Sequence, residues 1–329
     1  MKTFRRSAWF APFAVLFAIV LAAAPAAKAD ITINGTSYTK GVNLGSGTYT
    51  VTGTGNANNR LIVTKDCTIV LDGVSFAPTA NLTTGILSKK YYGYPAIFVT
   101  NGVTATIRLK GANTITPSST KGNQTGLYVG KGAAVHITNL TETASLKIDA
   151  SSYSGNVGIG GWAGENVSGG VVTFWGGTIV AKGGENGAGI GGANGGTGAT
   201  VTNWNANVTA TGGKDGAGIG GGNTGAGGTV EIYGGSVTAT GAQNGAGIGG
   251  GNTGAGGTVE IYGGSVTASS AKYGAGIGGG YQGAGGIVRV YGGTVTATGG
   301  AGAAGIGGGR NGAGGTFRID GGRATATGG

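Results

Sequence analysis

The sequence contains few of the residues that stabilise small exported domains or build common catalytic sites. Its 329 residues include one cysteine, one histidine, five prolines and only 11 acidic side chains. A single cysteine excludes an intramolecular disulfide framework, so burial and backbone hydrogen bonds have to stabilise the fold. Glycine contributes 80 residues, but the lack of a strict Gly-X-Y triplet and the few prolines exclude a collagen triple helix.

Basic residues are more numerous than acidic ones, but they are scattered. The formal net charge is +10, and no basic run after the first thirty residues is longer than the pair Lys89-Lys90. A nucleic-acid-binding protein normally presents a clustered basic patch, so we expect no nucleic-acid partner. The diffuse excess favours only a modest attraction to acidic polysaccharide or to an anionic cell surface.

The N-terminus has the pattern of a secretory signal peptide. Residues 2–6 include three basic side chains, residues 9–24 are apolar, and Ala27-Lys28-Ala29 provides the small residues of a cleavage site. The apolar run is short for a membrane anchor, which is the alternative interpretation. We therefore predict a signal peptide over 1–29 and a mature chain of net charge +6 with no membrane span. The predicted location is extracellular or on the cell surface, with the periplasm as an alternative.

An internal repeat dominates the rest of the chain. Five isoleucines recur every 29 residues, and the series continues backward more loosely through Ile159, Val129 and Val99 to a coil that contains Leu61 and Val63. Such a period is typical of a solenoid, here of about nine coils. We expect irregular coils over 30–157, with an insertion at 77–95, and regular repeats over 158–329. The five isoleucines are Ile190, Ile219, Ile248, Ile277 and Ile306.

One repeat illustrates the expected coil. Three short apolar-alternating segments, 245–249, 257–262 and 265–269, are separated by glycine-rich corners. Successive side chains of a strand point to opposite faces, so one parity fills the interior. The sequence predicts an all-β, single-domain parallel β-helix with three-stranded coils of 29–31 residues. The expected interior residues are Ala246, Ile248, Val259, Ile261, Val266 and Ala268.

Two further expectations concern burial. Cys67 has the same parity as Ile69 and Leu71, which predicts a buried, unreactive thiol. In the first segment of each repeat, glycine occupies the positions that we expect to face outward, for example Gly245, Gly247 and Gly249. We expect this wall of the solenoid to be nearly free of side chains.

The motifs resemble those of a known group of proteins. The segments Cys67-Thr-Ile-Val-Leu-Asp-Gly-Val74 and Gly126-Leu-Tyr-Val-Gly130 are followed by repeats of the type Gly-Ala-Gly-Ile-Gly-Gly-Gly and Gly-Gly-Ser-Val-Thr-Ala-Thr. Together they resemble bacterial secreted and surface proteins with glycine-rich right-handed parallel β-helix repeats, of the carbohydrate-binding domain-containing type. The resemblance covers nearly the whole mature chain. It implies the right-handed fold and polysaccharide binding, and it supplies no catalytic residue because the repeated motif is architectural.

Aromatic residues occupy one outward position of the second segment over five repeats. Thr138 precedes this file and Asp320 ends it. Exposed rings in a column provide a platform for sugar faces, or they stack on one another and stiffen the sheet. The residues are Trp175, Trp204, Tyr233, Tyr262 and Tyr291.

Hydroxyl residues form a second outward file, with a Thr-x-Thr pattern in the third segment. Two columns about 6.7 Å apart would give a flat, regular face, like the arrays of β-helical antifreeze proteins. Ice binding is one interpretation, and the high β-propensity of threonine is the other. The pairs are Thr209 and Thr211, Thr238 and Thr240, Thr267 and Ser269, Thr296 and Thr298, and Thr325 and Thr327.

A third file contains charged residues, and the sequence predicts an exposed ion pair in it between Glu260 and Arg289. The file is Arg108, His136, Thr173, Thr202, Glu231, Glu260, Arg289 and Arg318. The insertion at 77–95 is the other departure of interest, because irregular loops on a repeat often bind ligands. It either contacts a glycan or covers the end of the core, and its candidate contacts are Lys89, Lys90, Tyr91, Tyr92 and Tyr94.

The leading functional prediction is a non-catalytic secreted or cell-surface solenoid that binds polysaccharide or acts in adhesion. Ice binding is the first alternative, and a polysaccharide lyase is the second. We identify no catalytic residue, metal site or cofactor motif; His136 has no obvious nucleophile beside it, and the acids of the irregular half do not cluster. We also expect end-to-end self-association, because strand edges at Gly329 have no capping segment after them.

Overall fold

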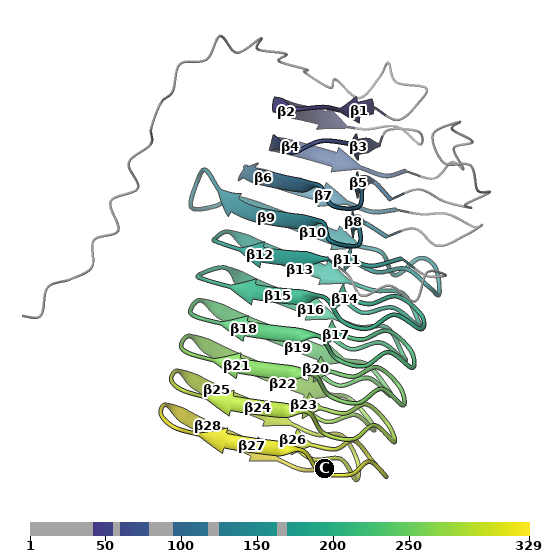
Figure 1. Ribbon diagram of the computed structural model, residues 1–329, viewed down its shortest axis with the longest axis vertical. Helices are drawn as coiled ribbons and strands as arrows, with labels where there is room; N and C mark the ends of the chain where they lie inside the picture. Colours follow the sequence, from purple (N-terminus) through teal and green to yellow (C-terminus); the bar gives the residue numbers. More distant parts are fainter. Residues whose placement is uncertain (1–41, 55–59, 79–94, 118–124, 163–169) are drawn as a thin grey trace, which may run out of the picture.

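The described part of the chain is a stack of parallel strands. The computed structural model describes residues 42–54, 60–78, 95–117, 125–162 and 170–329 (Figure 1). The signal peptide and the loop from Lys89 to Tyr94 lie outside these residues, so the predictions made for them remain predictions. No helix occurs in the described ranges, and none of them contains a helix that could cross a membrane.

The first strand of every coil belongs to one ten-stranded parallel sheet. Nine of its strands continue the series inferred from the sequence, and β1 adds a coil before Leu61. The strands are β1 (Val42–Leu44), β3 (Leu61–Val63), β5 (Ile97–Val99), β8 (Leu127–Val129), β11 (Ile159–Gly160), β14 (Ile190–Gly191), β17 (Ile219–Gly220), β20 (Ile248–Gly249), β23 (Ile277–Gly278) and β26 (Ile306–Gly307).

The second and third strands of the coils form an 18-stranded parallel sheet. Its second-strand members are β6 (Thr104–Lys110), β9 (Ala134–Asn139), β12 (Val171–Phe174), β15 (Thr200–Asn203), β18 (Thr229–Ile232), β21 (Thr258–Ile261), β24 (Ile287–Val290) and β27 (Thr316–Ile319). Its third-strand members are β7 (Ala112–Ile115), β10 (Ser145–Asp149), β13 (Thr178–Lys182), β16 (Asn207–Thr211), β19 (Ser236–Gly241), β22 (Ser265–Ser270), β25 (Thr294–Thr298) and β28 (Arg323–Thr327). The long strands β2 (Gly47–Thr54) and β4 (Cys67–Phe76) complete it.

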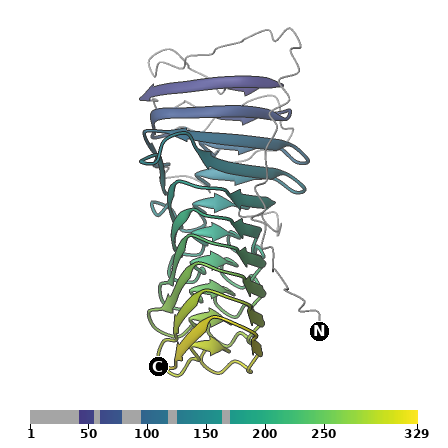
Figure 2. The same ribbon diagram turned by 90° about the vertical axis from the view of Figure 1, so that its left-hand side faces the viewer.

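The N-terminal coils differ from the regular ones in strand length. Strand β4 pairs with β6 through Cys67–Asp72 and with β7 through Ser75 and Phe76, so it spans both sides of the next coil. Figure 2 shows the long strands of these first coils beside the shorter strands of the later ones. The predicted three-stranded coil therefore holds for the regular repeats, whereas β2 and β4 each replace two strands.

The pairing register of the strands confirms the 29-residue period. It corrects the residue that the repeat assigned to one of the N-terminal coils. Ile190, Ile219 and Ile248 are direct partners along the first sheet, as are the isoleucines that follow. Ile159, however, pairs with Leu127 and not with Val129. Both residues of β8 are buried in the core, so their apolar character could not distinguish them, and only the backbone pairing does.

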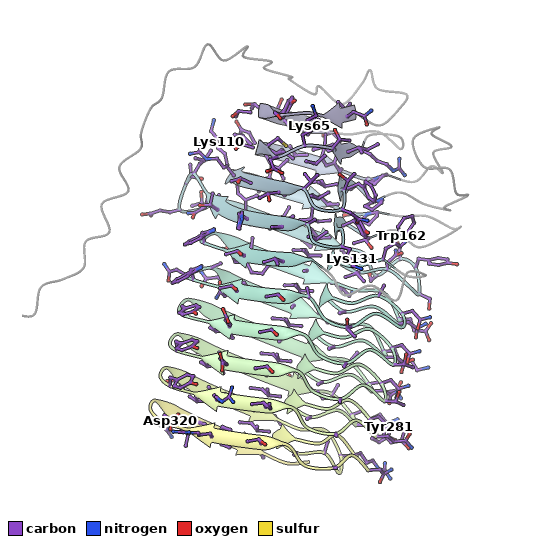
Figure 3. The ribbon with its side chains drawn as sticks, viewed as in Figure 1. Lys65, Lys110, Lys131, Trp162, Tyr281 and Asp320 are labelled. Carbon is purple, nitrogen blue, oxygen red and sulfur yellow. The ribbon has the colours of Figure 1, made fainter. Side chains whose placement is uncertain are left out.

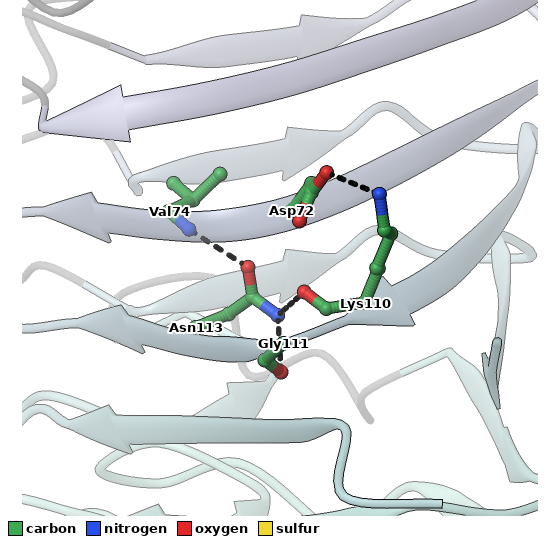
Figure 4. A network of polar contacts seen from close by, with 5 residues as sticks. All are labelled: Asp72, Val74, Lys110, Gly111 and Asn113. Atoms are coloured by element: carbon green, nitrogen blue, oxygen red, sulfur yellow. Dashed lines mark hydrogen bonds and ion pairs between the residues drawn. The ribbon is translucent and has the colours of Figure 1, made fainter. Parts of the chain in front are cut away.

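A buried asparagine stabilises the bend between the second and third strands. Asn113 is buried, and its Oδ1 accepts a hydrogen bond from Val74 N at 2.9 Å. Its Nδ2 donates to Lys110 O at 3.2 Å and to Gly111 O at 3.3 Å, while an ion pair of 2.9 Å joins Lys110 to Asp72 outside (Figure 4). The buried amide is thus satisfied, as a polar group in a core has to be.

The interior is a continuous column of aliphatic side chains. All six residues predicted to face inward in the 245–269 repeat are buried, with alternating burial along β21 and β22. Cys67 is also in the core, at 8% exposure, which confirms its predicted environment. Burial, together with the negative charge of Asp66, raises the pKa of the Cys67 thiol to about 11.

The expectation that the glycines of the first strand face outward, on a wall of the solenoid nearly free of side chains, is wrong. Gly245, Gly247 and Gly249 are buried. A Cβ on Gly247 would lie 2.5 Å from the backbone nitrogen of Ser269, and Gly249 has a φ of +138° with the backbone of Gly278 directly below it. These glycines are required because the backbone of the first strand packs against other backbone, which leaves no room for a side chain.

A second buried cluster occupies the other face of the first sheet in the N-terminal coils. It consists of Ile62, Phe98, Tyr128 and Trp162, of which Trp162 is labelled in Figure 3. The rings of Phe98 and Tyr128 stack at 4.8 Å between centroids. The sequence-based interpretation missed this cluster. The uninterrupted apolar runs of β3, β5 and β8 were a usable signal, because strands buried on both faces lack alternation.

Candidate functional site

The aromatic residues predicted to form a column do so. We call Trp175, Trp204, Tyr233, Tyr262 and Tyr291 the aromatic ladder. Each follows directly after a second strand, at the bend toward the third strand, and each backbone N–H donates to a carbonyl of the preceding coil; for Tyr262 the acceptor is Ile232 O at 2.8 Å. The next position in the column is Asp320, labelled at the left of Figure 3.

The rings of the aromatic ladder stack face to face. Successive centroids lie 5.3, 4.3, 4.7 and 4.8 Å apart, with interplanar angles between 3° and 11°. Four of the five side chains are 39–46% exposed, and Tyr233 is half-buried. Most ring faces are therefore covered by neighbouring rings, whereas the ring edges face solvent. The geometry has the stacking that stiffens a sheet, and each pair contributes about 0.5–1.5 kcal/mol beyond its buried area.

Charged side chains lie beside the ladder. Arg289 Nη1 pairs with Glu260 Oε1 at 2.8 Å, which confirms the predicted cross-coil pair. Tyr262 donates a hydrogen bond of 3.1 Å to the same carboxylate. Desolvation next to its neighbours, this hydrogen bond and the negative charge of Glu260 raise the pKa of Tyr262 to about 12. The phenol is consequently a neutral donor at any physiological pH.

One member of the predicted charge file is misplaced. Thr106 is the residue opposite His136 in the register, and Arg108 lies opposite Thr138. Arg108 therefore belongs to the line that leads into the aromatic ladder. The 30-residue step that separates the partners Val99 and Val129 also separates Thr106 from His136, so the sequence spacing itself indicates Thr106.

The hydroxyl pairs form a regular outward surface, which we call the hydroxyl face. Thr209, Thr238, Thr267, Thr296 and Thr325 are register partners in successive third strands, and so are Thr211, Thr240, Ser269, Thr298 and Thr327. The first column is exposed, and the second is half-buried to exposed. Val180 and Lys182 occupy the same columns one coil earlier, so the hydroxyl pattern starts at Thr209.

The loop residues predicted to contact a ligand, Lys89, Lys90, Tyr91, Tyr92 and Tyr94, lie outside the described residues, and their role stays a prediction. Within the described ranges, no three His, Cys, Asp or Glu side chains gather as they would around a metal ion. His136 lies in β9 between Thr106 and Thr173 of the neighbouring coils.

Sequence reasoning missed one small cavity at the N-terminal end of the aromatic ladder. Trp175 and the side chains of Asn139 and Glu142 contribute to its walls, and its volume is about 230 Å³. Its sequence signal is a longer bend: seven residues separate the paired positions Ile137 and Ser145, compared with three between Phe174 and Thr178.

Comparison with known families identifies the repeat. A family model described as a beta helix repeat matches residues 204–223, 230–252, 259–281 and 288–310. The chain is a parallel β-helix repeat protein. All four matches fall in the regular half of this β-helix, where the coils are identical in length. No curated protein and no solved structure matched the chain.

Proposed function

We propose that this β-helix is a non-catalytic, secreted or cell-surface protein that binds polysaccharide. The observation that supports the proposal is the aromatic ladder, whose exposed ring edges run in register over five coils beside the hydroxyl face. Both surfaces repeat once per coil, about 4.8 Å apart. A surface with a short regular repeat suits a ligand that is itself a regular polymer of hydroxyl-rich units.

The chemistry of this flank agrees with a neutral or weakly acidic glycan. The exposed ring edges of the ladder make apolar contacts with the C–H-rich faces of sugar rings and exclude water from between them. The threonine and serine hydroxyls exchange hydrogen bonds with sugar hydroxyls. The ion pairs nearby are exposed and contribute little to binding. Affinity for a single sugar unit would be weak, and many units bound along the stack would add up through multivalency.

Retention on insoluble glycans tests the proposal. We expect the purified mature protein to sediment with at least one member of a broad panel of insoluble polysaccharides. Trp204→Ala in the ladder, and Tyr92→Ala in the undescribed loop, should reduce retention. Tyr281→Ala is the matched control, because Tyr281 lies on the opposite ridge of the solenoid from Asp320 and the ladder (Figure 3). No retention on any member of the panel would refute polysaccharide binding.

Ice binding is a second candidate, and a separate observation favours it. The two columns of the hydroxyl face stay in register over five coils on a single parallel sheet, which is the periodic geometry that an ice-binding surface needs. Thr238→Tyr would break the face at its middle and should abolish thermal hysteresis. Thr202→Tyr, on the second strand, is the control that should leave it unchanged. A wild-type protein that neither shapes ice crystals nor shows hysteresis excludes this candidate.

A further inference from the structure

The bend between β9 and β10 is the most irregular corner beside the aromatic ladder. Residues 138–144 connect positions that residues 175–177 connect one coil later, so this bend has four additional residues. In Figure 1 it projects further to the left than the corner between β12 and β13 in the coil that follows. Insertions that interrupt a repeat on one side of a solenoid commonly carry its ligand contacts.

The additional residues form one wall of the small cavity. Asn139 is the last residue of β9 and Glu142 lies in the bend, Trp175 and Gly176 come from the next coil, and Asn205 and Asn207 come from the coil after it. Three consecutive coils thus meet at a space of about 230 Å³, which is small for a drug-sized ligand and suits a single sugar ring. We call this space the ladder-head site.

Trp175 is the end ring of the ladder that lies at the inserted bend, and another ladder ring stacks on only one of its faces. It stacks on Trp204 on one side, but the preceding position of the column is Thr138, which has no ring. The indole is 46% exposed. An exposed indole face is a good surface for the apolar C–H face of a pyranose, and the inner rings of the ladder cannot offer one.

The polar side chains around Trp175 retain hydrogen-bonding capacity. Asn139 Nδ2 donates to Thr141 O at 3.0 Å, which holds the bend in place and leaves its Oδ1 as an acceptor. The exposed carboxylate of Glu142 has no ion pair or hydrogen bond with any described residue. The side-chain amides of Asn205 and Asn207 are also exposed and make no hydrogen bond to a described residue. Carboxylate and amide groups provide both the acceptors and the donors that adjacent sugar hydroxyls require.

Gly176 keeps the site open. A Cβ at this position would collide with Asn139 Oδ1, so any larger residue would displace the amide that shapes the bend. Two later corners also have glycine at this position, but there the nearest atom to such a Cβ is a backbone carbonyl of the preceding coil, Trp204 O for Gly234 and Tyr233 O for Gly263. The close approach of a side chain from an inserted bend is particular to Gly176 among these three.

We propose that the ladder-head site binds one uncharged pyranose unit of the polysaccharide, with Trp175 against its C–H face and with Glu142, Asn139, Asn205 and Asn207 hydrogen-bonded to its hydroxyls. This inference rests on the proposed polysaccharide-binding function and specifies its ligand class. Glu142 is the one ionisable side chain in the described wall of the cavity. A carboxylate ligand such as a uronic acid would meet a like charge there, so the site selects neutral sugars over acidic ones.

Isothermal titration with soluble oligosaccharides tests this site. The probes are cellohexaose and mannohexaose, as neutral ligands, and a galacturonic acid hexamer as the acidic one. We expect at least one neutral probe to bind and the galacturonate to bind more weakly. Trp175→Ala should weaken the neutral complex by about tenfold, the size expected for loss of one aromatic stacking contact. Glu142→Gln should raise the affinity for galacturonate relative to the neutral probe, because it removes the like charge.

Two further variants separate a binding effect from a folding effect. Deleting residues 140–143 restores the length of a regular bend and should abolish binding while thermal unfolding stays cooperative. Tyr281→Ala removes a ring on the opposite ridge of the solenoid from the ladder (Figure 3) and should leave the affinity within about twofold. Wild-type affinity in both Trp175→Ala and the deletion variant, or galacturonate binding at least as tight as the neutral probes, would overturn the proposal.

The outcome also distinguishes this site from the general function. If insoluble glycans retain the deletion variant as well as the wild type, and Trp204→Ala reduces that retention, polysaccharide binding stands and the ladder-head site is refuted. If no glycan, soluble or insoluble, binds the wild type, both proposals fail together.

Discussion

Burial controls the chemistry of the single thiol. Cys67 lies in the core between the first coils, with Asp66 next to it, and both factors disfavour the thiolate. The reactive form of cysteine is the thiolate, so a raised pKa makes the side chain inert. Folding favours the protonated thiol, and this contribution to stability is present below the unfolded pKa of 9.0 and is lost as the pH rises toward 11.

Native alkylation should therefore be slow. At pH 8 we expect iodoacetamide to modify Cys67 in the folded protein at least about 100-fold more slowly than in denaturant, because two units of pKa correspond to that loss of thiolate. Mass spectrometry of timed samples measures the rates. Equal rates in folded and unfolded protein would show that the thiol is accessible and ionised as in a free peptide.

Stacking between coils gives each element its stability. An isolated coil buries little, and its strands have hydrogen-bond partners only in the coils before and after it. The same nearest-neighbour logic applies to the aromatic ladder, where inner rings have two stacked neighbours and Tyr291 has one. The position of a ring along the ladder should thus determine how much it contributes to the free energy of unfolding.

A pair of truncations in the ladder tests this dependence. Tyr233→Ala removes two stacking contacts and Tyr291→Ala removes one, so Tyr233→Ala should lower the free energy of unfolding by about 0.5–1.5 kcal/mol more. Urea unfolding followed by circular dichroism measures the difference. Identical losses for the two variants would mean that ring stacking does not stabilise the sheet.

The glycine column of the first sheet makes a second prediction at this scale. Gly249→Ala forces a side chain into a φ of +138° and against the Gly278 backbone, and should cost roughly 2–4 kcal/mol. Gly314→Ala is the matched control, because its Cβ would meet nothing within 4 Å, and its effect should stay within about 0.5 kcal/mol. Denaturation midpoints of the two variants provide the comparison, and a neutral Gly249→Ala would contradict the close backbone packing.

At the scale of the whole molecule, the coil of β26, β27 and β28 leaves part of the core open. Phe317 and Ile319 pair in register with the buried Val288 and Val290, yet they are 43% and 47% exposed. Within the described residues, no further coil pairs with β27 or β28 on this side. Apolar core residues beside open strand edges favour association with a second copy.

We accordingly expect the mature chain to self-associate in a concentration-dependent way. Phe317→Lys places a charge on the open core and should shift the sedimentation profile toward the monomer. Thr325→Lys adds the same charge on the outward side of the neighbouring strand, and should have little effect. A wild-type protein that sediments strictly as a monomer at high concentration would contradict this prediction.

The sequence by itself determined the solenoid, because its two periodicities are local. A spacing of 29 residues fixed the register of the isoleucines, and alternation within each strand fixed which side chains, such as Val259 and Ile261, are buried. The same counting placed the rings of Trp175 to Tyr291 in one column and Glu260 beside Arg289.

Only the tertiary structure decided features that depend on contacts across coils of unequal length. Counting could not choose between Leu127 and Val129, because both residues are apolar and keep the alternation, and only backbone pairing separates them. It also could not reveal that the glycines of the first strand are buried against backbone. The ring faces of the ladder are covered for the same reason, since stacking is a through-space property. The two end rings each have one stacked neighbour, and Trp175 is the one beside the inserted bend, where it lines the ladder-head site.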